Sequence, residues 1–321
     1  EYSPESQSFI RCEAFPLRTN YLIVDEASMM DLELASSLLS ALLPNSSILL
    51  VGDRDQLPSV GPGTVLKDVI ASGLVAVAEL REVYRQARQS LIISNAHRIN
   101  RGEFPELSND PHGDFFFFER SAPEDVIATV KQLVRERLVG RFGLRDARDI
   151  QVITPMNRGA LGTQSLNREL QSLLNPSGRA IRSGDREIRD GDRVIQLRNN
   201  YDKGVFNGEI GCVAAVYPDE GKIDVDFEET RASYDFSELD EIGLAYAISV
   251  HKSQGSQYPA VVMPLHQSHY LMLRRNLLYT AITRAERVCV LVGTKSALAQ
   301  AVRNAEERTR FSRLADRLRI D

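Results

Sequence analysis

The stretch Tyr21-Leu22-Ile23-Val24-Asp25-Glu26 decides the fold class of this chain. Four consecutive apolar residues followed by two acidic ones predict a strand that is buried on both faces, as in a parallel sheet. From Asp31 to Leu43 the apolar residues recur at helical spacing, with Asp31 as the expected N-cap. Ile48-Leu49-Leu50-Val51 predicts a second buried strand. Strand, helix and strand joined by short connections form a right-handed βαβ unit, so we expect an α/β fold.

Further along the chain, helical and strand-like patterns continue from residue 76, but the pattern of apolar residues changes between residues 176 and 243. There helical periodicity vanishes, and short alternating runs separated by turn residues predict a small antiparallel barrel. We therefore expect three parts, a first α/β domain, a second α/β domain in two pieces and an inserted barrel: residues 1–75, residues 76–175 with 244–321, and residues 176–243. Outside the barrel the second domain is expected to contain strands at 76–80, 115–118, 150–153, 260–263 and 288–292, and helices at 90–101, 122–140, 161–174 and 271–282.

The charge of the chain is uneven. Its net charge of −5 excludes a uniformly basic nucleic-acid binder. Residues 1–75 carry a net charge of −6, residues 176–243 a net charge of −7 and residues 244–321 a net charge of +7. The basic C-terminal block predicts either a local site for a polyanion or a solvated helix face. Three widely separated cysteines argue against a disulfide scaffold, and no apolar run is long enough for a membrane span, so we expect a cytoplasmic protein.

Asp25 and Glu26 form a Walker B pattern at the end of a strand. Asp25 is placed to hold Mg²⁺ beside a nucleotide, and Glu26 to orient and deprotonate the attacking water. The alternative is a buried strand that meets the N-terminus of a helix, where carboxylates are favoured in any case. Gln56, at the end of the next strand, can hydrogen-bond a γ-phosphate or the lytic water; the alternative there is an ordinary polar loop.

Two arginines and one polar loop are further candidates for contact with phosphates. Arg85 and Arg284 could clamp a γ-phosphate, as arginine fingers do, or could form surface salt bridges. The loop from Val250 to Gln257 contains His251, Lys252 and Ser253, and could hold a nucleic-acid phosphate while its neighbours sense the nucleotide. A polar loop without function is the alternative. The five histidines show no metal-like spacing.

Taken in order, these segments resemble the motor core of superfamily 1 helicases, and most closely the RecD-like family (the exodeoxyribonuclease V alpha subunit and its stand-alone relatives). Six stretches carry the resemblance, as motifs II to VI with one segment between IV and V: IVDEASMMD, LLVGDRDQLPSVGPG, LREVYRQ, VITPMNRGALGTQSLN, AYAISVHKSQGSQYPAVV and LLYTAITRAERV. The resemblance implies a RecA-like P-loop helicase core, with a partial domain 1A, a domain 2A and an inserted SH3-like barrel as domain 2B.

The resemblance also implies roles for individual residues. Asp25 would be the Mg²⁺ carboxylate, Glu26 the catalytic base and Gln56 the γ-phosphate sensor, while Arg85 and Arg284 would be the transition-state arginines. The implied ATP contacts are Gln86, Gly255 and Gln257, the last standing where related helicases have a glutamate. The implied contacts to single-stranded DNA are Thr154, Asn157, Arg158, His251, Lys252 and Ser253.

One motif of the family has no counterpart in the sequence. The Walker A motif requires Gly-Lys followed by Ser or Thr, and the single Gly-Lys pair, Gly221-Lys222, is followed by Ile223. We therefore expect the chain to be a C-terminal fragment of a 5′-to-3′ DNA helicase acting in recombination and repair, inactive by itself. The alternative is a non-catalytic DNA- or partner-binding module of a helicase–nuclease complex. A ring-forming ATPase is disfavoured because both arginines follow in the same chain. Whether the parent works alone or with RecB- and RecC-type subunits stays open.

Overall fold

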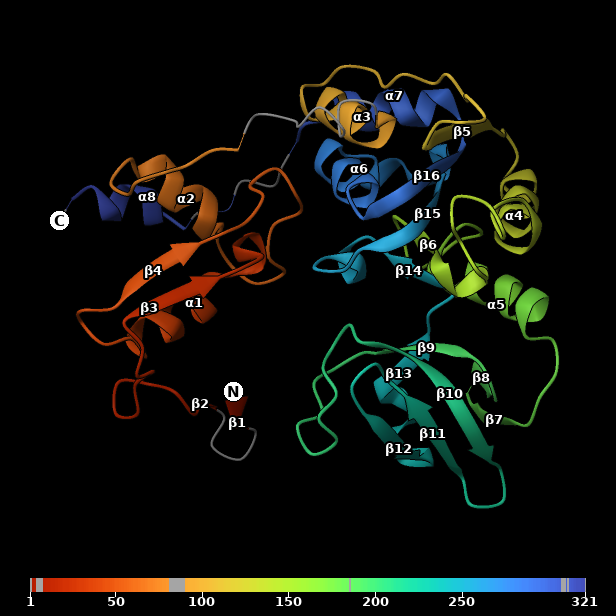
Figure 1. The fold of residues 1–321 in the computed structure, drawn as a ribbon, viewed down its shortest axis with the longest axis horizontal. Coiled ribbons are helices and arrows are strands. Elements are labelled where there is room, and N and C mark those ends of the chain that lie inside the picture. Colours follow the sequence, from red (N-terminus) through yellow and green to blue (C-terminus); the bar gives the residue numbers. More distant parts are fainter. Residues whose placement is uncertain are drawn as a thin grey trace. The chain divides into compact units, whose positions relative to one another are not determined.

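The computed structural model describes residues 2–3, 8–80, 90–184, 186–306, 310 and 312–320. The chain divides into two compact units: the first contains Glu1–Tyr84 together with Ala305–Asp321, and the second contains Arg85–Asn304. These units differ from the expected domains in two places. The first unit extends beyond residue 75, and it includes the C-terminal segment that was expected in the second α/β domain. Each unit is described by itself (Figure 1).

The first unit contains the predicted βαβ motif. Strand β3 (Tyr21–Val24) pairs in parallel with β4 (Ser47–Leu50), and helix α1 (Leu32–Ser40) connects them. The side chain of Asp31 caps α1, as predicted, by accepting a hydrogen bond from the amide of Leu34 at 2.8 Å. The remaining elements are the short hairpin β1 (Tyr2–Ser3) and β2 (Ser8–Phe9), helix α2 (Val65–Ser72) and helix α8 (Leu314–Leu318).

The expectation that both strands are buried on both faces was wrong. Tyr21 is 57% exposed and Ile23 is 60% exposed, and Leu49 on β4 is also exposed. In the part of the chain that the structure describes, this sheet has only β3 and β4, and the unit's core includes Leu50 but neither Tyr21 nor Ile23. The unit's core is correspondingly small and centres on Met30, Ala35 and Val65.

The C-terminal segment joins the first unit through Arg310. Its guanidinium donates to the backbone carbonyls of Ser59, Gly61 and Gly63, at distances between 2.5 and 2.9 Å. Helix α8 packs on helix α2. These hydrogen bonds and the packing of α8 on α2 join the described part of the C-terminal segment to the first unit.

The second unit is built on a five-stranded parallel sheet with the order β14-β6-β15-β16-β5. Helices α4 and α5 cover one face, and α3, α6 and α7 cover the other (Figure 1). The bounds of these elements are α3 (Leu91–Asn100), β5 (Phe115–Glu119), α4 (Pro123–Gln132), β6 (Ile150–Thr154), α5 (Thr163–Leu174), β14 (Ala247–Ser249), β15 (Tyr258–Leu265), α6 (Arg275–Ile282), β16 (Ala285–Gly293) and α7 (Lys295–Arg303).

Three expectations about local structure need correction. Residues 76–80 form no strand and are exposed, since no neighbouring strand pairs with them among the described residues. The helix expected at 122–140 is α-helical only to Gln132 and continues as a π-helical turn, Leu133–Arg137. The helix expected at 271–282 begins as a 3₁₀ helix, Gln267–Met272, and becomes α-helical only from Arg275.

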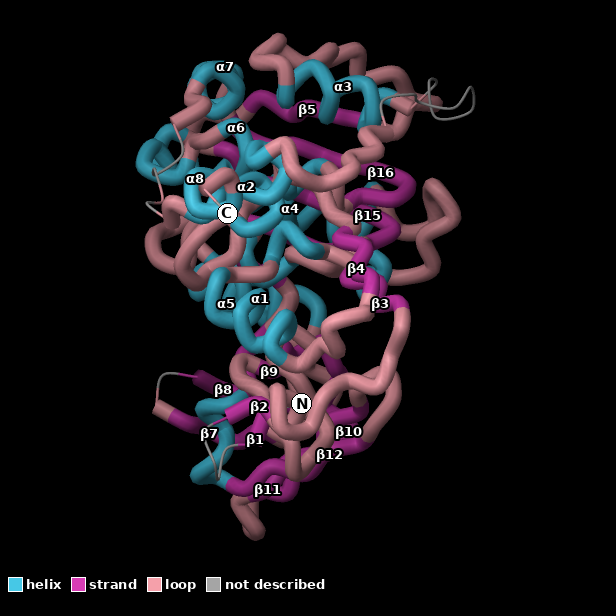
Figure 2. The backbone as a smooth tube through the Cα atoms, turned by 90° about the vertical axis from the view of Figure 1, so that its left-hand side faces the viewer, coloured by secondary structure: helices cyan, strands magenta, loops and turns pink. Residues whose placement is uncertain are grey.

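The predicted barrel is present, with its own core. Its main sheet has the order β12-β11-β10-β9-β13 with antiparallel pairing, and β7 and β8 form a hairpin beside it. Strands and loops dominate this part, whereas the longer helices α3 to α7 belong to the α/β part (Figure 2). The bounds are β7 (Ala180–Ser183), β8 (Arg186–Arg189), β9 (Arg193–Gln196), β10 (Ile210–Tyr217), β11 (Lys222–Asp226), β12 (Arg231–Asp235) and β13 (Ile242–Leu244).

Candidate functional site

In the first unit, β3 ends at the predicted acidic pair. The amide of Glu26 donates to Oδ1 of Asp25 at 2.8 Å. Glu26 has a φ of 50°, a left-handed conformation that is strained for a residue with a side chain. Backbone hydrogen bonds from Val51 to Val24 and from Ala27 to Val51 hold this turn against the end of β4. A strained acidic residue at the carboxyl end of a parallel strand is typical of a residue placed for chemistry.

Gln56 lies in the loop that follows β4 and is 8% exposed. Its Nε2 donates to Oδ2 of Asp53 at 3.3 Å, which fixes the amide. A Cβ on Gly52 would lie 3.0 Å from the backbone nitrogen of Ser28, so this loop passes close to the turn at Glu26 and leaves little room for a side chain there. The structure therefore brings the loops of Asp25, Glu26 and Gln56 together within the first unit.

In the second unit, the carboxyl edge of the five-stranded sheet also carries loops with predicted site residues. Strands β6 and β14 are parallel neighbours, with Thr154 paired with Ser249, and the amide of Val250 donates to the carbonyl of Thr154 at 3.2 Å. The loops 155–162 and 250–257 therefore leave the sheet side by side at its carboxyl edge, where open α/β sheets bind ligands. These two loops contain five of the six residues expected to contact DNA, and the sixth, Thr154, is the last residue of β6.

In the first of these loops Asn157 and Arg158 are exposed. Gly162 makes the turn into α5 possible, because a Cβ there would lie 2.5 Å from the carbonyl oxygen of Arg158. Thr154 itself is fully buried, and its hydroxyl donates to the carbonyl of Leu161 at 2.6 Å. Its position favours a structural role in shaping the loop over the DNA contact that the sequence suggested.

The second loop presents His251 and Gln257 at the surface, and Lys252 is half-buried. Desolvation by the surrounding protein lowers the pKa of both His251 and Lys252. Ser253 is fully buried, and its hydroxyl donates to the carbonyl of Val250 at 2.8 Å, so it too is placed for structure rather than for DNA. Gly255 has a φ of 74°, which a residue with a side chain rarely adopts.

Arg284 follows helix α6 and is 3% exposed. Its Nη1 donates to the carbonyl of Ser256 at 3.2 Å, and its own carbonyl accepts from the amide of Tyr258 at 2.8 Å. The arginine is thus joined to the 250–257 loop at Ser256 and to the start of β15 at Tyr258. Arg85 and Gln86, which are also expected to contact the nucleotide, lie outside the described residues.

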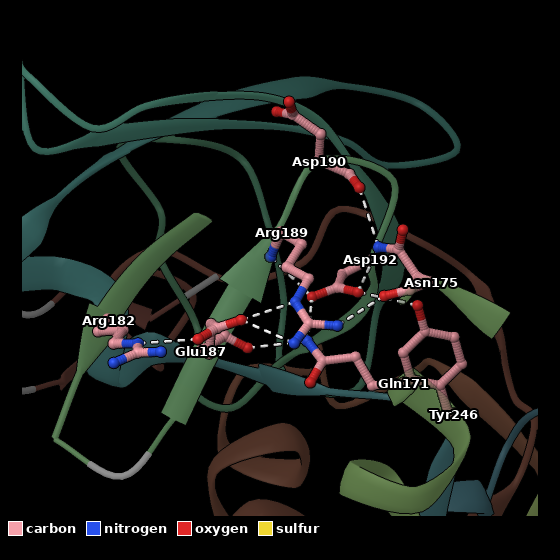
Figure 3. Close-up of polar contacts among 8 residues, drawn as sticks. All are labelled: Gln171, Asn175, Arg182, Glu187, Arg189, Asp190, Asp192 and Tyr246. Atoms are coloured by element: carbon pink, nitrogen blue, oxygen red, sulfur yellow. Dashed lines mark hydrogen bonds and ion pairs between the residues drawn. The ribbon is translucent and has the colours of Figure 1, made fainter. Parts of the chain in front are cut away.

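A buried polar joint, which the sequence did not predict, connects the barrel to helix α5. Asp192 is fully buried and accepts from Nδ2 of Asn175 at 2.7 Å, from Nε2 of Gln171 at 2.6 Å, from the hydroxyl of Tyr246 at 2.9 Å and from the amide of Arg189 at 2.7 Å. Figure 3 shows these side chains converging on the Asp192 carboxylate. Burial and the nearby carboxylate raise the pKa of Tyr246, so its hydroxyl stays a donor.

Arg193, the next residue, extends this joint. Its Nη1 donates to the carbonyl of Arg148 at 2.9 Å and also faces the carbonyl of Ile150. The sequence contained one signal of the joint, two consecutive charged residues directly before an apolar strand. The partners could not be read from it, because Gln171 and Tyr246 lie on opposite sides of the barrel insertion in the sequence.

Three family models match the chain: an AAA domain over residues 11–112, an ATP-dependent RecD-like DNA helicase SH3 domain over residues 166–227, and a UvrD-like helicase C-terminal domain over residues 244–292. The ATP-dependent RecD2 DNA helicase of Deinococcus radiodurans is 37% identical over 318 residues, which cover 99% of this chain and 42% of that protein. The chain is similar to the RecD-like helicases along nearly its whole length.

Other RecD proteins give the same result. The RecBCD enzyme subunit RecD of Mycolicibacterium smegmatis is 28% identical, over 98% of this chain and 57% of that protein. The chain spans about half the length of the curated relatives it matches. The expected resemblance, and the SH3 character of the barrel, are confirmed.

Solved structures agree on the fold. A Pif1 helicase from Bacteroides in complex with ADP-AlF3 and single-stranded DNA matches with a TM-score of 0.55 and 16% identity, over 96% of this chain and 76% of that one. A second Pif1 structure, at forked double-stranded DNA, matches with a TM-score of 0.53 and 17% identity, over 96% of this chain and 75% of that one. These structures confirm the α/β fold of the core, and the SH3 family model confirms the SH3-like barrel.

Among the residues described by the structure, no three or more His, Cys, Asp or Glu side chains are grouped so as to hold a metal ion. No helix in the described part of the chain is both long and apolar enough to cross a bilayer.

Proposed function

We propose that this chain is the C-terminal motor part of an ATP-dependent helicase that translocates 5′ to 3′ on single-stranded DNA in recombination and repair. The observation that carries the proposal is the hydrogen bond from Arg284 to the carbonyl of Ser256. It joins the arginine expected at the nucleotide to the loop expected at the DNA. A change at the γ-phosphate that moves Arg284 would then move the DNA-binding loop, which is the coupling that a motor needs.

At the nucleotide, we assign Asp25 to Mg²⁺, Glu26 to the attacking water and Gln56 to the γ-phosphate. The donor set fits a magnesium ion, because Asp25 exposes a carboxylate at the end of β3, and Mg²⁺ is held by one or two carboxylates together with waters and substrate phosphates. Bound there, the ion would neutralise charge on the phosphates. Glu26, held in its strained turn, would orient the water and accept its proton.

At the DNA, we assign the exposed and half-buried residues of the two loops: Asn157, Arg158, His251 and Lys252. The contacts should be mainly to phosphates, because a translocating motor has to move past any sequence. Thr154 and Ser253 are left out because their hydroxyls are buried and bonded to carbonyls. Gly255 and Gln257, in the 250–257 loop, stay candidates for contact with the nucleotide. Arg85 and Gln86 are assigned to the nucleotide from the sequence alone.

A second candidate function is a non-catalytic DNA- or partner-binding module. The absence of Gly-Lys-Ser/Thr from these 321 residues favours it for the chain taken alone. Without the P-loop no backbone amides cradle the β-phosphate and no lysine neutralises it, so we propose that this chain alone hydrolyses ATP negligibly. We further propose that the protein acts in the cytoplasm, either alone or with RecB- and RecC-type subunits. The native mass of the protein purified from its own cells distinguishes these two states.

The test uses the full-length protein and measures ATP turnover with and without single-stranded DNA. Arg284→Ala should reduce turnover by about 10³-fold, the scale of a lost arginine finger, while DNA affinity changes little. Arg303→Ala, an exposed arginine on α7, is the matched control and should keep full turnover. Turnover within a few-fold of wild type in Arg284→Ala would make this arginine structural. DNA-stimulated turnover by the 321-residue chain itself would overturn the proposal for the fragment.

A further inference from the structure

An apolar cavity of about 300 Å³ lies at the β5 edge of the second unit's sheet. The two loops assigned to DNA follow β6 and β14, at the other end of the strand order. It opens between strand β5 and the π-helical turn Leu133–Arg137. Phe116 and Phe118 of β5, Leu138 and Phe142 form its apolar walls, and Arg137 and Arg141 stand at its rim. β5 is the edge strand opposite β14, so this cavity belongs to neither of the two loops described above.

The backbone around the cavity is irregular in two ways. The amide of Leu138 bonds to the carbonyl of Leu133, five residues earlier, at 3.1 Å, which widens the turn after α4. Phe142 has a φ of 53°, which is rare and costly for an aromatic residue. Its ring packs edge-on against Phe116 with centroids 5.7 Å apart. π-helical turns and strained residues are both over-represented at functional sites.

The rim is cationic. The guanidinium of Arg137 lies 5.8 Å from the centre of the Phe118 ring, and that of Arg141 lies 5.4 Å from the centre of the Phe142 ring. Both arginines are exposed, and no carboxylate within the described ranges forms an ion pair with either of them. Arg287 adds a third cation nearby, since its Nη1 donates to the carbonyl of Gly143.

An apolar pocket with a cationic rim selects a ligand that combines a bulky apolar group with negative charge. We propose that this cavity docks an acidic peptide segment of a partner protein, with one aromatic side chain inserted between Phe116, Phe118 and Phe142 and carboxylates on Arg137 and Arg141. A nucleic acid is the poorer fit. Its bases would lose hydrogen bonds in a cavity walled by phenylalanine and leucine side chains, and each unpaired polar group is costly.

The test uses this chain and a fluorescein-labelled peptide in which a run of aspartates adjoins a single phenylalanine, followed by fluorescence polarisation. Saturable binding that weakens with salt is expected. Replacing the phenylalanine of the peptide by alanine, or its aspartates by asparagines, should each weaken binding at least about tenfold. These peptide changes cannot unfold the protein, so they test the pocket and the rim independently of any variant.

Protein variants then locate the site. Arg137→Ala and Arg141→Ala should each weaken peptide binding about tenfold, whereas Arg135→Ala, on the same turn but outside the cavity lining, should leave it unchanged. No saturable binding at millimolar peptide would overturn the proposal, as would binding that ignores the phenylalanine. Equal competition by an oligothymidine, lost in Arg137→Ala, would assign the rim to nucleic acid instead. None of these outcomes depends on ATP turnover, so the result stands apart from the proposed helicase function.

Discussion

Lys252 donates a hydrogen bond from Nζ to Oδ1 of Asn207, and this bond ties the loop after β14 to a turn of the barrel. Lys252 is half-buried there, and desolvation lowers the pKa of its ammonium group. The barrel thus holds the one lysine of the 250–257 loop in place. The acidic barrel (net charge −7 over residues 176–243) is by its charge a poor binding site for a polyanion. It nevertheless positions Lys252, whose positive charge is suited to contact a phosphate.

The first prediction separates the charge of Lys252 from its position. Lys252→Ala should weaken binding of single-stranded DNA and reduce the slope of log affinity against log salt by about one unit, because one phosphate contact is lost. Asn207→Ala keeps the charge and should leave the slope as it is. A salt titration of oligonucleotide binding measures both, and an unchanged slope in Lys252→Ala would remove this lysine from the DNA site.

The second prediction concerns the joint at Asp192. Four donors point at its buried carboxylate, so Asp192→Asn both removes the charge and turns an NH₂ group toward other donors. We expect the free energy of unfolding to fall by about 2–4 kcal/mol. Urea denaturation measures it, with the exposed Asp219→Asn as a control that should stay within about 0.5 kcal/mol. Equal midpoints for the two variants would show that the joint contributes little.

The third prediction uses the left-handed backbone of Glu26. Glycine adopts this conformation without strain, so Glu26→Gly should raise the free energy of unfolding by about 1 kcal/mol, whereas Glu26→Gln, which keeps the Cβ, should change it little. Both variants should abolish ATP turnover in the full-length protein. Denaturation and turnover are measured on the same samples. A glycine variant that is no more stable than the glutamine variant would argue against strain at this turn.

The fourth prediction is a pH dependence that comes from His269. This residue is buried, and desolvation, aided by His266, lowers its pKa from 6.5 to about 4. The folded state therefore takes up the proton less readily than the unfolded state. Its contribution to stability is complete above about pH 6.5 and declines as the pH falls toward 4, by a few kcal/mol in all.

His269→Gln removes the titration and keeps a polar side chain at this position. Its free energy of unfolding should consequently decline less than that of the wild type as the pH is lowered from about 7 to about 4.5. Parallel decline of the two proteins across that range would assign the acid sensitivity to other groups.

Much of the fold could be predicted because local patterns determine it. The run from Tyr21 to Glu26 and the helical spacing after Asp31 fix the βαβ motif, and alternation fixes the barrel strands. Burial could not be predicted in the same way, since it depends on neighbours. Tyr21 and Ile23 read as buried, yet they are exposed on a sheet that has two strands among the described residues.

The candidate site follows the same division. The motif positions at Asp25, Gln56 and Lys252 could be identified from order and spacing, and the structure places them at strand ends and loops. The side-chain directions at Thr154 and Ser253 could not be. A hydroxyl in a polar motif suggests a ligand contact, but here each one satisfies a backbone carbonyl of its own loop. Such local bonding leaves no trace in the residue types.

The insertion of the barrel also sets the order in which the second unit is completed on the ribosome. Strands β5 and β6 leave the exit tunnel first, but their sheet partners, β14 to β16, are translated only after the whole barrel. At synthesis rates of about 5–20 residues per second, the nascent β6 waits on the order of ten seconds for its neighbours. The barrel has its own core, whereas β16, the strand that pairs with β5 among the described residues, is still missing in that interval. The nascent chain therefore carries unpaired strand edges, which favour aggregation, until residue 293 has emerged.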